Sequence, residues 1–285
     1  LGIPSSSFAA CSGATTHDLT ANSAQGYRLV NIDGSIGPSV PAQLCQTTKV
    51  RLTTLGMWVP PCPKGVTPAL TSDVDLVTLT IGGNDIGFKD VILGCATGDC
   101  SSDQSLNRKV NDRLGALAGA NKAKIDGNDI LPLTGLFSAI HQLAPNAHIY
   151  VAGYPMLFQA PAQVKECLLA TALWQGLAYN VSVPRDRVDW MDSQVVRLNK
   201  VVQNAASNAG PWVSYIDVTQ VFMGHGICGG DANSWIYPVV ANIHINTRAD
   251  GISKLISPNA ISASAHPTVE GQLAYERAFL TSIQG

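Results

Sequence analysis

The chain has 285 residues, enough for one large domain or two small ones, because a domain averages roughly 150 residues. Hydrophobic residues make up 46% of the chain and charged residues 13%. Soluble domains ordinarily carry about 25% charged residues, so this composition excludes a charge-driven disordered protein. The net charge is −2, from 18 basic and 20 acidic residues without a run of like charges. It argues against nucleic acid or an anionic membrane as a partner, since both attract a concentrated basic surface.

Two further features of the composition indicate a soluble, secreted protein. The least polar long stretch, residues 167–183, contains Gln175, Gly176 and Asn180. No segment therefore reaches the roughly 18 to 20 apolar residues of a membrane span, and integral membrane association is not expected. The chain has seven cysteines but neither a Cys-x-x-Cys pair nor a Cys/His cluster, which indicates disulfides formed in an oxidising compartment rather than a metal site.

The first quarter of the chain predicts one strand and a long irregular insertion. Residues 6–10 read as a strand that runs into a turn of small residues at 11–16. The segment 34–72 is rich in Pro, Gly, Ser and Thr, and its prolines exclude long regular structure. Cys45 and Cys62 lie inside this insertion and are placed to close it with a local disulfide.

The rest of the chain alternates between predicted strands and helices. Residues 75–81 are rich in β-branched side chains and predict a buried strand that ends at Gly82-Gly83-Asn84-Asp85. A helix over 131–143 and a strand over 148–153 follow, which together predict a parallel crossover. Further on, the pattern predicts a helix over 192–206, a strand over 212–218 and a helix over 268–283. No linker or repeat interrupts the series, so we expect residues 1–285 to form one three-layer α/β/α domain.

Three short segments place polar groups in loops where backbone amides can be exposed. They are Cys11-Ser12-Gly13-Ala14, Gly82-Gly83-Asn84-Asp85 and Ala265-His266-Pro267-Thr268. Each alone is more often an ordinary turn or loop than a catalytic element. Only their joint order and spacing indicate a catalytic site.

In that order the three segments resemble blocks II, III and V of the SGNH hydrolases, specifically the secreted actinobacterial lipases and phospholipases of the GDSL-like group. The resemblance covers residues 8–16, 77–85, 153–155, 224–228 and 266–271. It spans nearly the whole chain, apart from an insertion near 38–68 and a loop near 246–263. The resemblance implies a flavodoxin-like parallel sheet and a monomeric secreted hydrolase of lipid or other acyl esters, without a cofactor.

The resemblance also assigns roles to four residues. Acyl transfer needs a nucleophile, a base beside it, and donors aimed at the developing oxyanion. His266 matches the base, while the Gly13 backbone amide and the Asn84 side-chain amide match the oxyanion donors. Many relatives orient the histidine with an Asp three residues before it, but that position is Ala263 here. We therefore expect the Ala263 carbonyl to accept the imidazole N–H in place of a carboxylate.

The nucleophile of the family pattern is not found at its expected place. A Gly-Asp-Ser segment should precede Cys11, and none is present. Asp33-Gly34-Ser35 lies after block II and reads as a turn rather than as the nucleophile segment. We expect the serine in a segment upstream of Leu1. The 285-residue chain alone would then lack the first central strand and would be inactive and unstable.

The cysteine count agrees with this expectation, because seven is odd and a secreted protein seldom leaves a thiol unpaired. In the family, the block II cysteine, here Cys11, bridges to a cysteine shortly after the nucleophile. The remaining six are expected to pair as Cys45 with Cys62, Cys95 with Cys100, and Cys167 with Cys228. The last two pairs follow from the resemblance.

Other residues receive plainer interpretations. His17, His141, His148 and His244 lack motif context and are expected on the surface or in loops. His225 lies in a family-like segment beside Cys228 and is expected to support its loop, with a position flanking the substrate cleft as the alternative. Trp58 and Trp235 are expected in loops, where aromatic side chains usually pack against neighbours rather than bind ligands.

Three functions stay open at this point. The first is a serine ester hydrolase acting on lipids. The second is an inactive SGNH-like domain that binds an ester or glycan without turnover, and the third is an esterase for acetylated carbohydrate. An upstream Gly-Asp-Ser segment followed by a cysteine favours an enzyme, whereas a start codon near Leu1 favours the binding domain.

Overall fold

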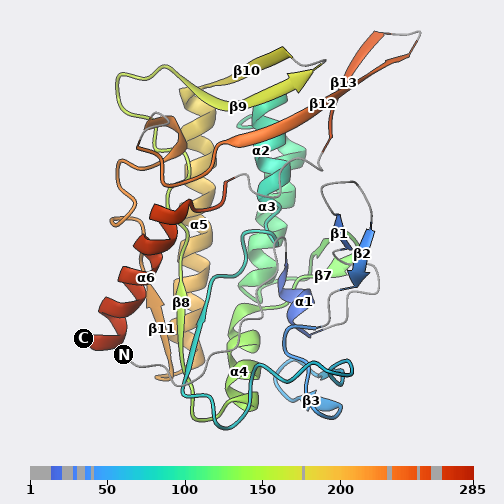
Figure 1. The fold of residues 1–285 in the computed structure, drawn as a ribbon, viewed down its shortest axis with the longest axis vertical. Coiled ribbons are helices and arrows are strands. Elements are labelled where there is room, and N and C mark those ends of the chain that lie inside the picture. Colours follow the sequence, from blue (N-terminus) through green and yellow to red (C-terminus); the bar gives the residue numbers. More distant parts are fainter. Residues whose placement is uncertain are drawn as a thin grey trace. The chain divides into compact units, whose positions relative to one another are not determined.

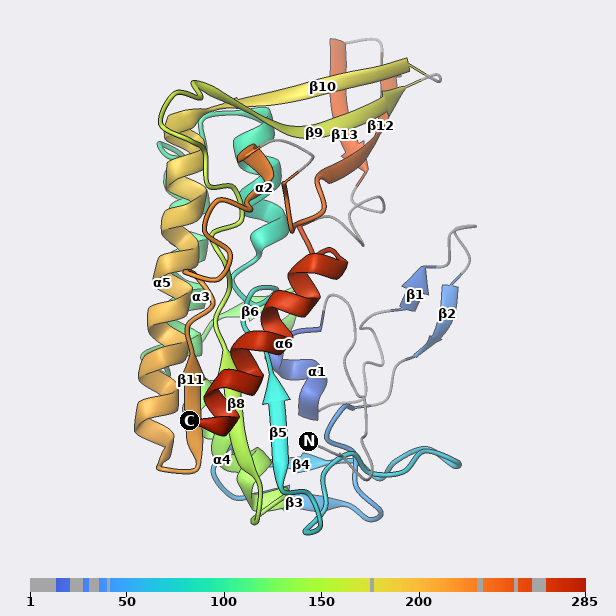
Figure 2. The ribbon, with the colours of Figure 1, turned by 60° about the vertical axis from the view of Figure 1, so that its left-hand side comes forward.

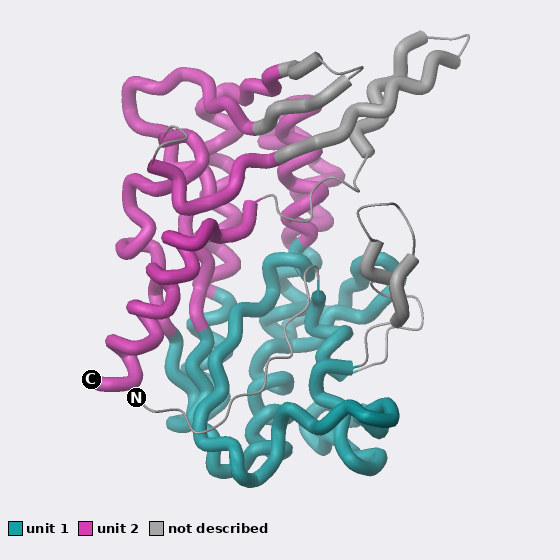
Figure 3. Tube along the Cα trace, in the orientation of Figure 1, with its two compact units in different colours: residues 1–86, 112–151, 201–215 teal, residues 87–111, 152–200, 216–285 magenta. Residues whose placement is uncertain are grey.

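The computed structural model describes residues 14–20, 28–30, 36–39, 42–174, 177–229, 233–248, 251–257 and 265–285. The predicted strand at 6–10 lies outside these residues. The chain divides into two compact units (Figure 3). Unit 1 comprises Leu1–Ile86, Asp112–Val151 and Val201–Tyr215, and unit 2 comprises Gly87–Asn111, Ala152–Lys200 and Ile216–Gly285. Each unit is assembled from separated stretches of sequence, and the single-domain assignment stays a prediction.

A parallel sheet of order β11-β8-β5 confirms the predicted α/β class (Figure 2). Its strands are β5 (Leu76–Leu79), β8 (His148–Ala152) and β11 (Val213–Ile216). β5 and β8 pair in parallel, with Leu76 opposite His148 and Leu79 opposite Val151. All three strands lie where the β-branched runs predict them.

The burial of these strands differs in part from the prediction. In β8, Ile149, Val151 and Ala152 are fully buried, as expected for an inner strand. β5, in contrast, alternates between exposed and half-buried residues, and Leu76 is 38% exposed. β5 forms an edge of the sheet among the described residues, so the prediction of a buried strand was wrong for these residues.

The connection between β5 and β8 contains three helices, of which one was predicted. The predicted one is α4 (Leu133–Leu143), whose buried side chains include Leu136, Phe137 and Ile140 at the spacing of one helical face. The other two are α2 (Phe88–Thr97) and α3 (Gln104–Leu117). In unit 1 the connection also contains a small hairpin of β6 (Lys124–Ile125) and β7 (Asn128–Asp129).

The described residues of the Pro-rich insertion form only short elements, as predicted. They are β2 (Ile36–Ser39), which pairs with β1 (Arg28–Val30), and the hairpin of β3 (Val50–Leu52) and β4 (Met57–Val59). Gln142 of α4 anchors this second hairpin, because its side chain donates to the Arg51 carbonyl and accepts from the Thr53 amide. Trp58 lies in β4 rather than in a loop, with the Lys49 ammonium 5.1 Å from its ring.

Unit 2 contains a second sheet that the sequence analysis did not predict (Figure 1). Its order is β10-β9-β12-β13, formed by β9 (Glu166–Trp174), β10 (Leu177–Pro184), β12 (Val239–Arg248) and β13 (Gly251–Ser257). β9 pairs with β10 and β12 with β13 in antiparallel hairpins, and β9 pairs with β12 in parallel. The expectation of a loop near 246–263 was therefore wrong for residues 246–248 and 251–257, and His244 lies in a strand.

Two long helices and one short helix complete the described elements of this part of the chain. α5 (Arg185–Ala209) begins seven residues before the predicted helix at 192–206, because Val188 and Met191 extend the buried stripe of Val195 and Leu198. α6 (Val269–Gln284) lies where the pattern predicts it, and a 3₁₀ turn, η1 (Ile227–Gly229), precedes β12. Within the described part of the chain, no helix is long and apolar enough to cross a membrane.

Candidate active site

Asn84 stands at the carboxyl end of β5, in the turn that the glycines before it allow. Gly82 has a φ of 110°, a backbone conformation that side chains with a Cβ rarely adopt. The turn closes through the Ile86 amide, which donates to the Gly82 carbonyl at 3.1 Å. Asn84 is exposed, and its Nδ2 donates to the Ala14 carbonyl at 2.9 Å. The structure therefore joins the motif at 82–85 to the residue that directly follows Gly13 in the chain.

Asp85, next to Asn84, is fully buried and bonds to the first residue of α1 (Thr16–Thr20). Its Oδ1 accepts from the Thr16 amide at 3.0 Å and from the Thr16 hydroxyl at 2.6 Å. Burial raises the pKa of Asp85 from 3.8 to about 6, although the two Thr16 bonds oppose the shift and the nearby Asp18 carboxylate adds to it. A second link thus joins the motif at 82–85 to the segment that follows Gly13.

His266 belongs to unit 2, where backbone hydrogen bonds fix the segment around it. The Ala265 amide donates to the Tyr237 carbonyl at 3.0 Å, and the Tyr237 amide donates to the His266 carbonyl at 2.9 Å. The Thr268 amide then donates to the Trp235 carbonyl at 2.8 Å. Ala265 has a φ of 59°, so the chain turns sharply just before the histidine. His266 itself is an exposed residue.

Helix α6 begins three residues after His266, and its first turn lies close to Trp235. Thr268 is its N-cap, and its hydroxyl accepts from the Gly271 amide at 3.3 Å. Gly271 allows a close approach, because a Cβ there would lie 2.3 Å from the Trp235 carbonyl oxygen. The Trp235 ring also stacks on His225 with ring centroids 3.5 Å apart. His225 bonds the Asn233 carbonyl through Nδ1, which is the supporting role expected for it.

The motif at 153–155 is held by polar side chains that the sequence analysis did not identify. Asn199 of α5 accepts from the Tyr154 amide at 2.7 Å and donates to its carbonyl at 2.8 Å. The Tyr275 hydroxyl of α6 donates to the Gly153 carbonyl at 3.0 Å. Asp192 accepts from the amides of residues 158 and 159, and burial raises its pKa to about 6.

All three predicted disulfides are present in the structure. They are Cys45–Cys62, Cys95–Cys100 and Cys167–Cys228. The last joins β9 to η1, and the Cys228 amide also donates to the Phe158 carbonyl. Cys11 lies outside the described residues.

The remaining predicted site residues have mixed outcomes. Gly13 and Ala263 lie outside the described residues, so their roles stay predictions. Asn84 belongs to unit 1 and His266 to unit 2, and their convergence on one active site stays a prediction as well. Among the described residues, no group of three or more His, Cys, Asp or Glu side chains is arranged to hold a metal ion.

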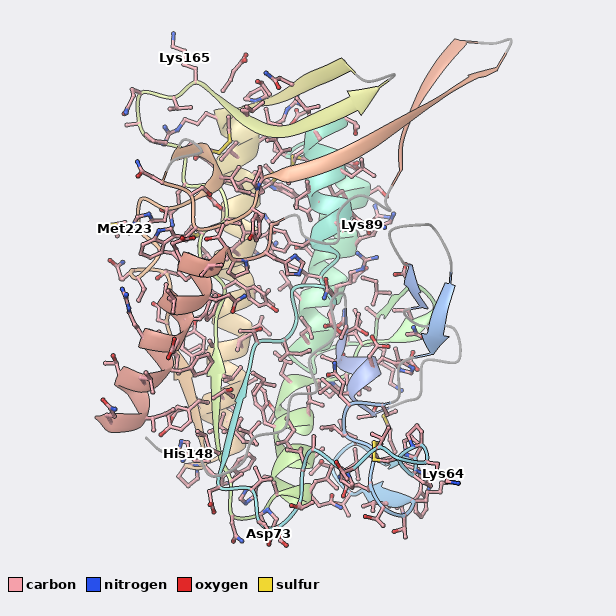
Figure 4. The ribbon with its side chains drawn as sticks, in the orientation of Figure 1. Lys64, Asp73, Lys89, His148, Lys165 and Met223 are labelled. Atoms are coloured by element: carbon pink, nitrogen blue, oxygen red, sulfur yellow. A yellow bond between two sulfur atoms is a disulfide. The ribbon has the colours of Figure 1, made fainter. Side chains whose placement is uncertain are left out.

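Besides His244 in β12, three of the other histidines lie in helices or strands rather than in loops: His17 in α1, His141 in α4 and His148 in β8. His148 stands at the beginning of β8 (Figure 4), and its Nε2 lies 2.9 Å from the Ser214 hydroxyl of β11. His141 of α4 stacks on Trp212 with ring centroids 4.2 Å apart. The expectation of a loop was therefore wrong for His17, His141 and His148, which are all half-buried residues.

Comparison with known proteins links the chain to bacterial lipases, although no family model matches it. Lipase 2 of Streptomyces coelicolor is 31% identical over 180 residues, which is 62% of this chain and 55% of that lipase. The chain is a homologue of Streptomyces lipases. A lipase of Streptomyces rimosus is 27% identical over 205 residues, or 70% of this chain and 64% of the relative. The chain therefore spans less than two thirds of the length of these relatives.

Two solved structures are also similar. Phospholipase A1 from Streptomyces albidoflavus has a TM-score of 0.49 at 25% identity, covering 74% of this chain and 70% of that one. The extracellular lipase of Streptomyces rimosus has a TM-score of 0.49 at 22% identity, covering 74% and 71%.

Proposed function

We propose that the protein is a secreted SGNH-type hydrolase that cleaves carboxylic esters of lipids through a serine acyl-enzyme. The similarity to Streptomyces lipases supports the lipid ester as substrate. The observation that carries the proposal is the hydrogen bond between Asn84 and Ala14. It brings together the two segments to which the motif assigns the oxyanion donors.

The proposed reaction uses His266 as the base. The nucleophilic serine, expected in a Gly-Asp-Ser segment upstream of Leu1, attacks the ester carbonyl carbon while His266 takes the hydroxyl proton. The tetrahedral oxyanion is bound by the Gly13 amide and the Asn84 side-chain amide. The bond to the alcohol then breaks as His266 returns the proton to the leaving oxygen. Water next attacks the acyl-serine with the same base, which releases the carboxylic acid and restores the serine.

The local structure suits Asn84 to this role. A side-chain amide has two N–H donors, and the Ala14 carbonyl takes one of them. This bond fixes the rotation of the amide and aims the second N–H, so little reorganisation is needed when charge develops on the substrate oxygen. Pre-organised donors of this kind are worth a factor of about 100 to 1000 in kcat.

Secretion and a monomeric state belong to the same proposal. Three disulfides in the described residues are the usual sign of an oxidising compartment. Size-exclusion chromatography with light scattering on the secreted protein tests the monomer, and a dimer mass would overturn that part.

The test of the proposed function is hydrolysis of short- and long-chain p-nitrophenyl esters by the protein expressed from its complete reading frame. His266→Ala should abolish turnover, and Asn84→Ala should lower kcat about 100-fold or more with KM nearly unchanged. Asn146→Ala is a matched control, because Asn146 is also exposed and also donates to a backbone carbonyl, that of Ser72. The proposal fails if His266→Ala keeps full activity.

The ester assay, with an acetate-release assay on acetylated sugars beside it, separates the two alternatives. A protein that binds esters or glycans without turnover shows no hydrolysis in any variant. An esterase for acetylated carbohydrate releases acetate from acetylated sugars but leaves long-chain esters intact.

A further inference from the structure

Asn84 and Asp85 are consecutive residues, and both bond to the segment that begins α1. Asn84 donates to the Ala14 carbonyl at 2.9 Å, while Asp85 accepts from the Thr16 amide and hydroxyl at 3.0 and 2.6 Å. Thr15, between those partners, bonds Asp18 through its amide and its hydroxyl, both at 2.8 Å. Two adjoining residues of one segment are thus cross-linked to two nearly adjoining residues of the other.

We propose that Asp85 and Thr16 are positioning residues, which hold the Asn84 amide and the chain next to Gly13 in the geometry that the oxyanion needs. This inference rests on the proposed function. Neither Asp85 nor Thr16 is assigned a contact with the substrate. They act through Asn84 and through the backbone that follows Gly13.

Burial distinguishes the two positioning residues, Thr16 and Asp85, from the proposed oxyanion donor, Asn84. Thr16 and Asp85 are both 0% exposed, whereas Asn84 is exposed. Water therefore does not compete for the Thr16 and Asp85 bonds, which hold the residue next to Asn84 in the chain. A buried polar group whose bonds are all made specifies one arrangement, because any other arrangement leaves a polar atom unpaired.

The Thr16 hydroxyl extends the support into the body of unit 1. While it donates to Asp85, it also accepts from the Leu131 amide at 2.9 Å. Leu131 is buried two residues before α4. One hydroxyl thus ties three separate stretches of chain together: the turn after β5, the start of α1 and the approach to α4.

The distances show how little movement the arrangement tolerates. Asp85 is joined to Asn84 by a single peptide unit, so a shift of the Asp85 backbone displaces the Asn84 amide as well. A shift of about 1 Å would stretch the 2.6 Å bond beyond hydrogen-bonding range. It would also move the Asn84 donor outside the 2.7 to 3.1 Å that oxyanion stabilisation requires. Loss of the Thr16 bonds should therefore lower kcat strongly and change KM only slightly.

The test uses a pair of substitutions at one position in the protein from the complete reading frame. Thr16→Val keeps the shape of the side chain but removes the hydroxyl, and Thr16→Ser keeps the hydroxyl. We expect Thr16→Val to lower kcat for p-nitrophenyl esters about 10-fold to 100-fold with KM within about twofold, and Thr16→Ser to recover most of that loss. If Thr16→Val does not fold, Asp85→Asn takes its place: its amide oxygen can still accept one Thr16 bond, but its NH2 group cannot accept from the Thr16 amide as the second carboxylate oxygen does at 3.2 Å. Its kcat should fall by a smaller factor than that of Thr16→Val, and an unchanged kcat would overturn the inference.

A double-mutant cycle distinguishes positioning from a general loss of structure. If Thr16 acts through Asn84, Thr16→Val should cost much less in kcat when Asn84 is already Ala. Equal fold losses in the two backgrounds would overturn the inference. Thr20→Val is the matched control, since Thr20 is also 0% exposed and its hydroxyl donates to the His17 carbonyl of its own helix, and it should leave kcat unchanged.

The two proposals fail in different ways. If Asn84→Ala leaves ester hydrolysis unchanged, the proposed function is wrong. If Asn84→Ala is impaired and folded Thr16→Val turns over at the normal rate, the function stands and the positioning role is wrong.

Discussion

The buried Asp85 carboxyl makes a specific prediction about the pH dependence of stability. Replacing it with Asn keeps the size of the side chain and an oxygen for the Thr16 donors, but removes the titrating group. We expect wild-type protein to become less stable as the pH rises from about 4 to about 7. The Asp85→Asn variant should lose a large part of this dependence.

The magnitude and the sign follow from the pKa values. The pKa of Asp85 is raised from 3.8 to about 6 in the folded state, chiefly by burial. Between these two values the folded protein keeps a proton that the unfolded chain has released, so the free energy of unfolding falls as the pH rises. The effect is fully present below the unfolded pKa and is lost above about pH 6. A shift of about two units corresponds to about 3 kcal/mol.

Urea unfolding of the full-length protein between pH 4 and 7.5 measures this effect directly. The quantity to compare is the change in unfolding free energy with pH, wild type against Asp85→Asn, because carboxyls remote from Asp85 contribute equally to both. Asp192, whose pKa is also raised to about 6, should leave part of the slope in the variant. Identical slopes in the two proteins would refute the reasoning, since Asp85 would then titrate alike when folded and unfolded.

Two further predictions concern the framework of unit 2. Replacing Cys167 and Cys228 with Ser should lower the unfolding free energy by about 4 kcal/mol, because the disulfide closes a loop over a sequence separation of 61; an unchanged urea midpoint would contradict this. Gly271→Ala should destabilise by roughly 1 to 3 kcal/mol and lower ester hydrolysis, since its Cβ would lie 2.3 Å from the Trp235 carbonyl. Gly98→Ala, which meets only one atom at 3.8 Å, is the control and should unfold like wild type.

The parallel sheet was predictable because its signal is local. β5 and β8 are runs of β-branched residues, and a helical pattern between them leaves a parallel crossover as the favoured connection. α3 was missed although a signal exists. Leu106, Val110, Leu114 and Leu117 recur at helical spacing within the helix, and all four are buried. The many polar residues between them obscured that stripe.

The sheet of β9, β10, β12 and β13 could not be predicted in the same way. Its central pairing joins Ala170 to Val239 in parallel, across a long stretch of sequence that contains α5 and β11. The residues near either strand in the sequence do not indicate which distant strand will pair with it. Residues 243–247 do alternate between Ile or Thr and polar residues, which is the pattern of a strand, so the strand itself was open to prediction even though its partner was not.

In the candidate site, too, residue types could be predicted from the sequence, whereas tertiary contacts could not. Asn84 and His266 stand in recognisable motifs, so their chemistry is visible in the sequence. Asp85 stands in the same motif, but the sequence does not show that Thr16, 69 positions away, encloses it. An aspartate on the surface and an aspartate buried against a threonine are the same residue in the sequence, and only the tertiary structure distinguishes them. The residues that aim a catalytic group are therefore harder to predict than the group itself, because their role depends on contacts rather than on residue type.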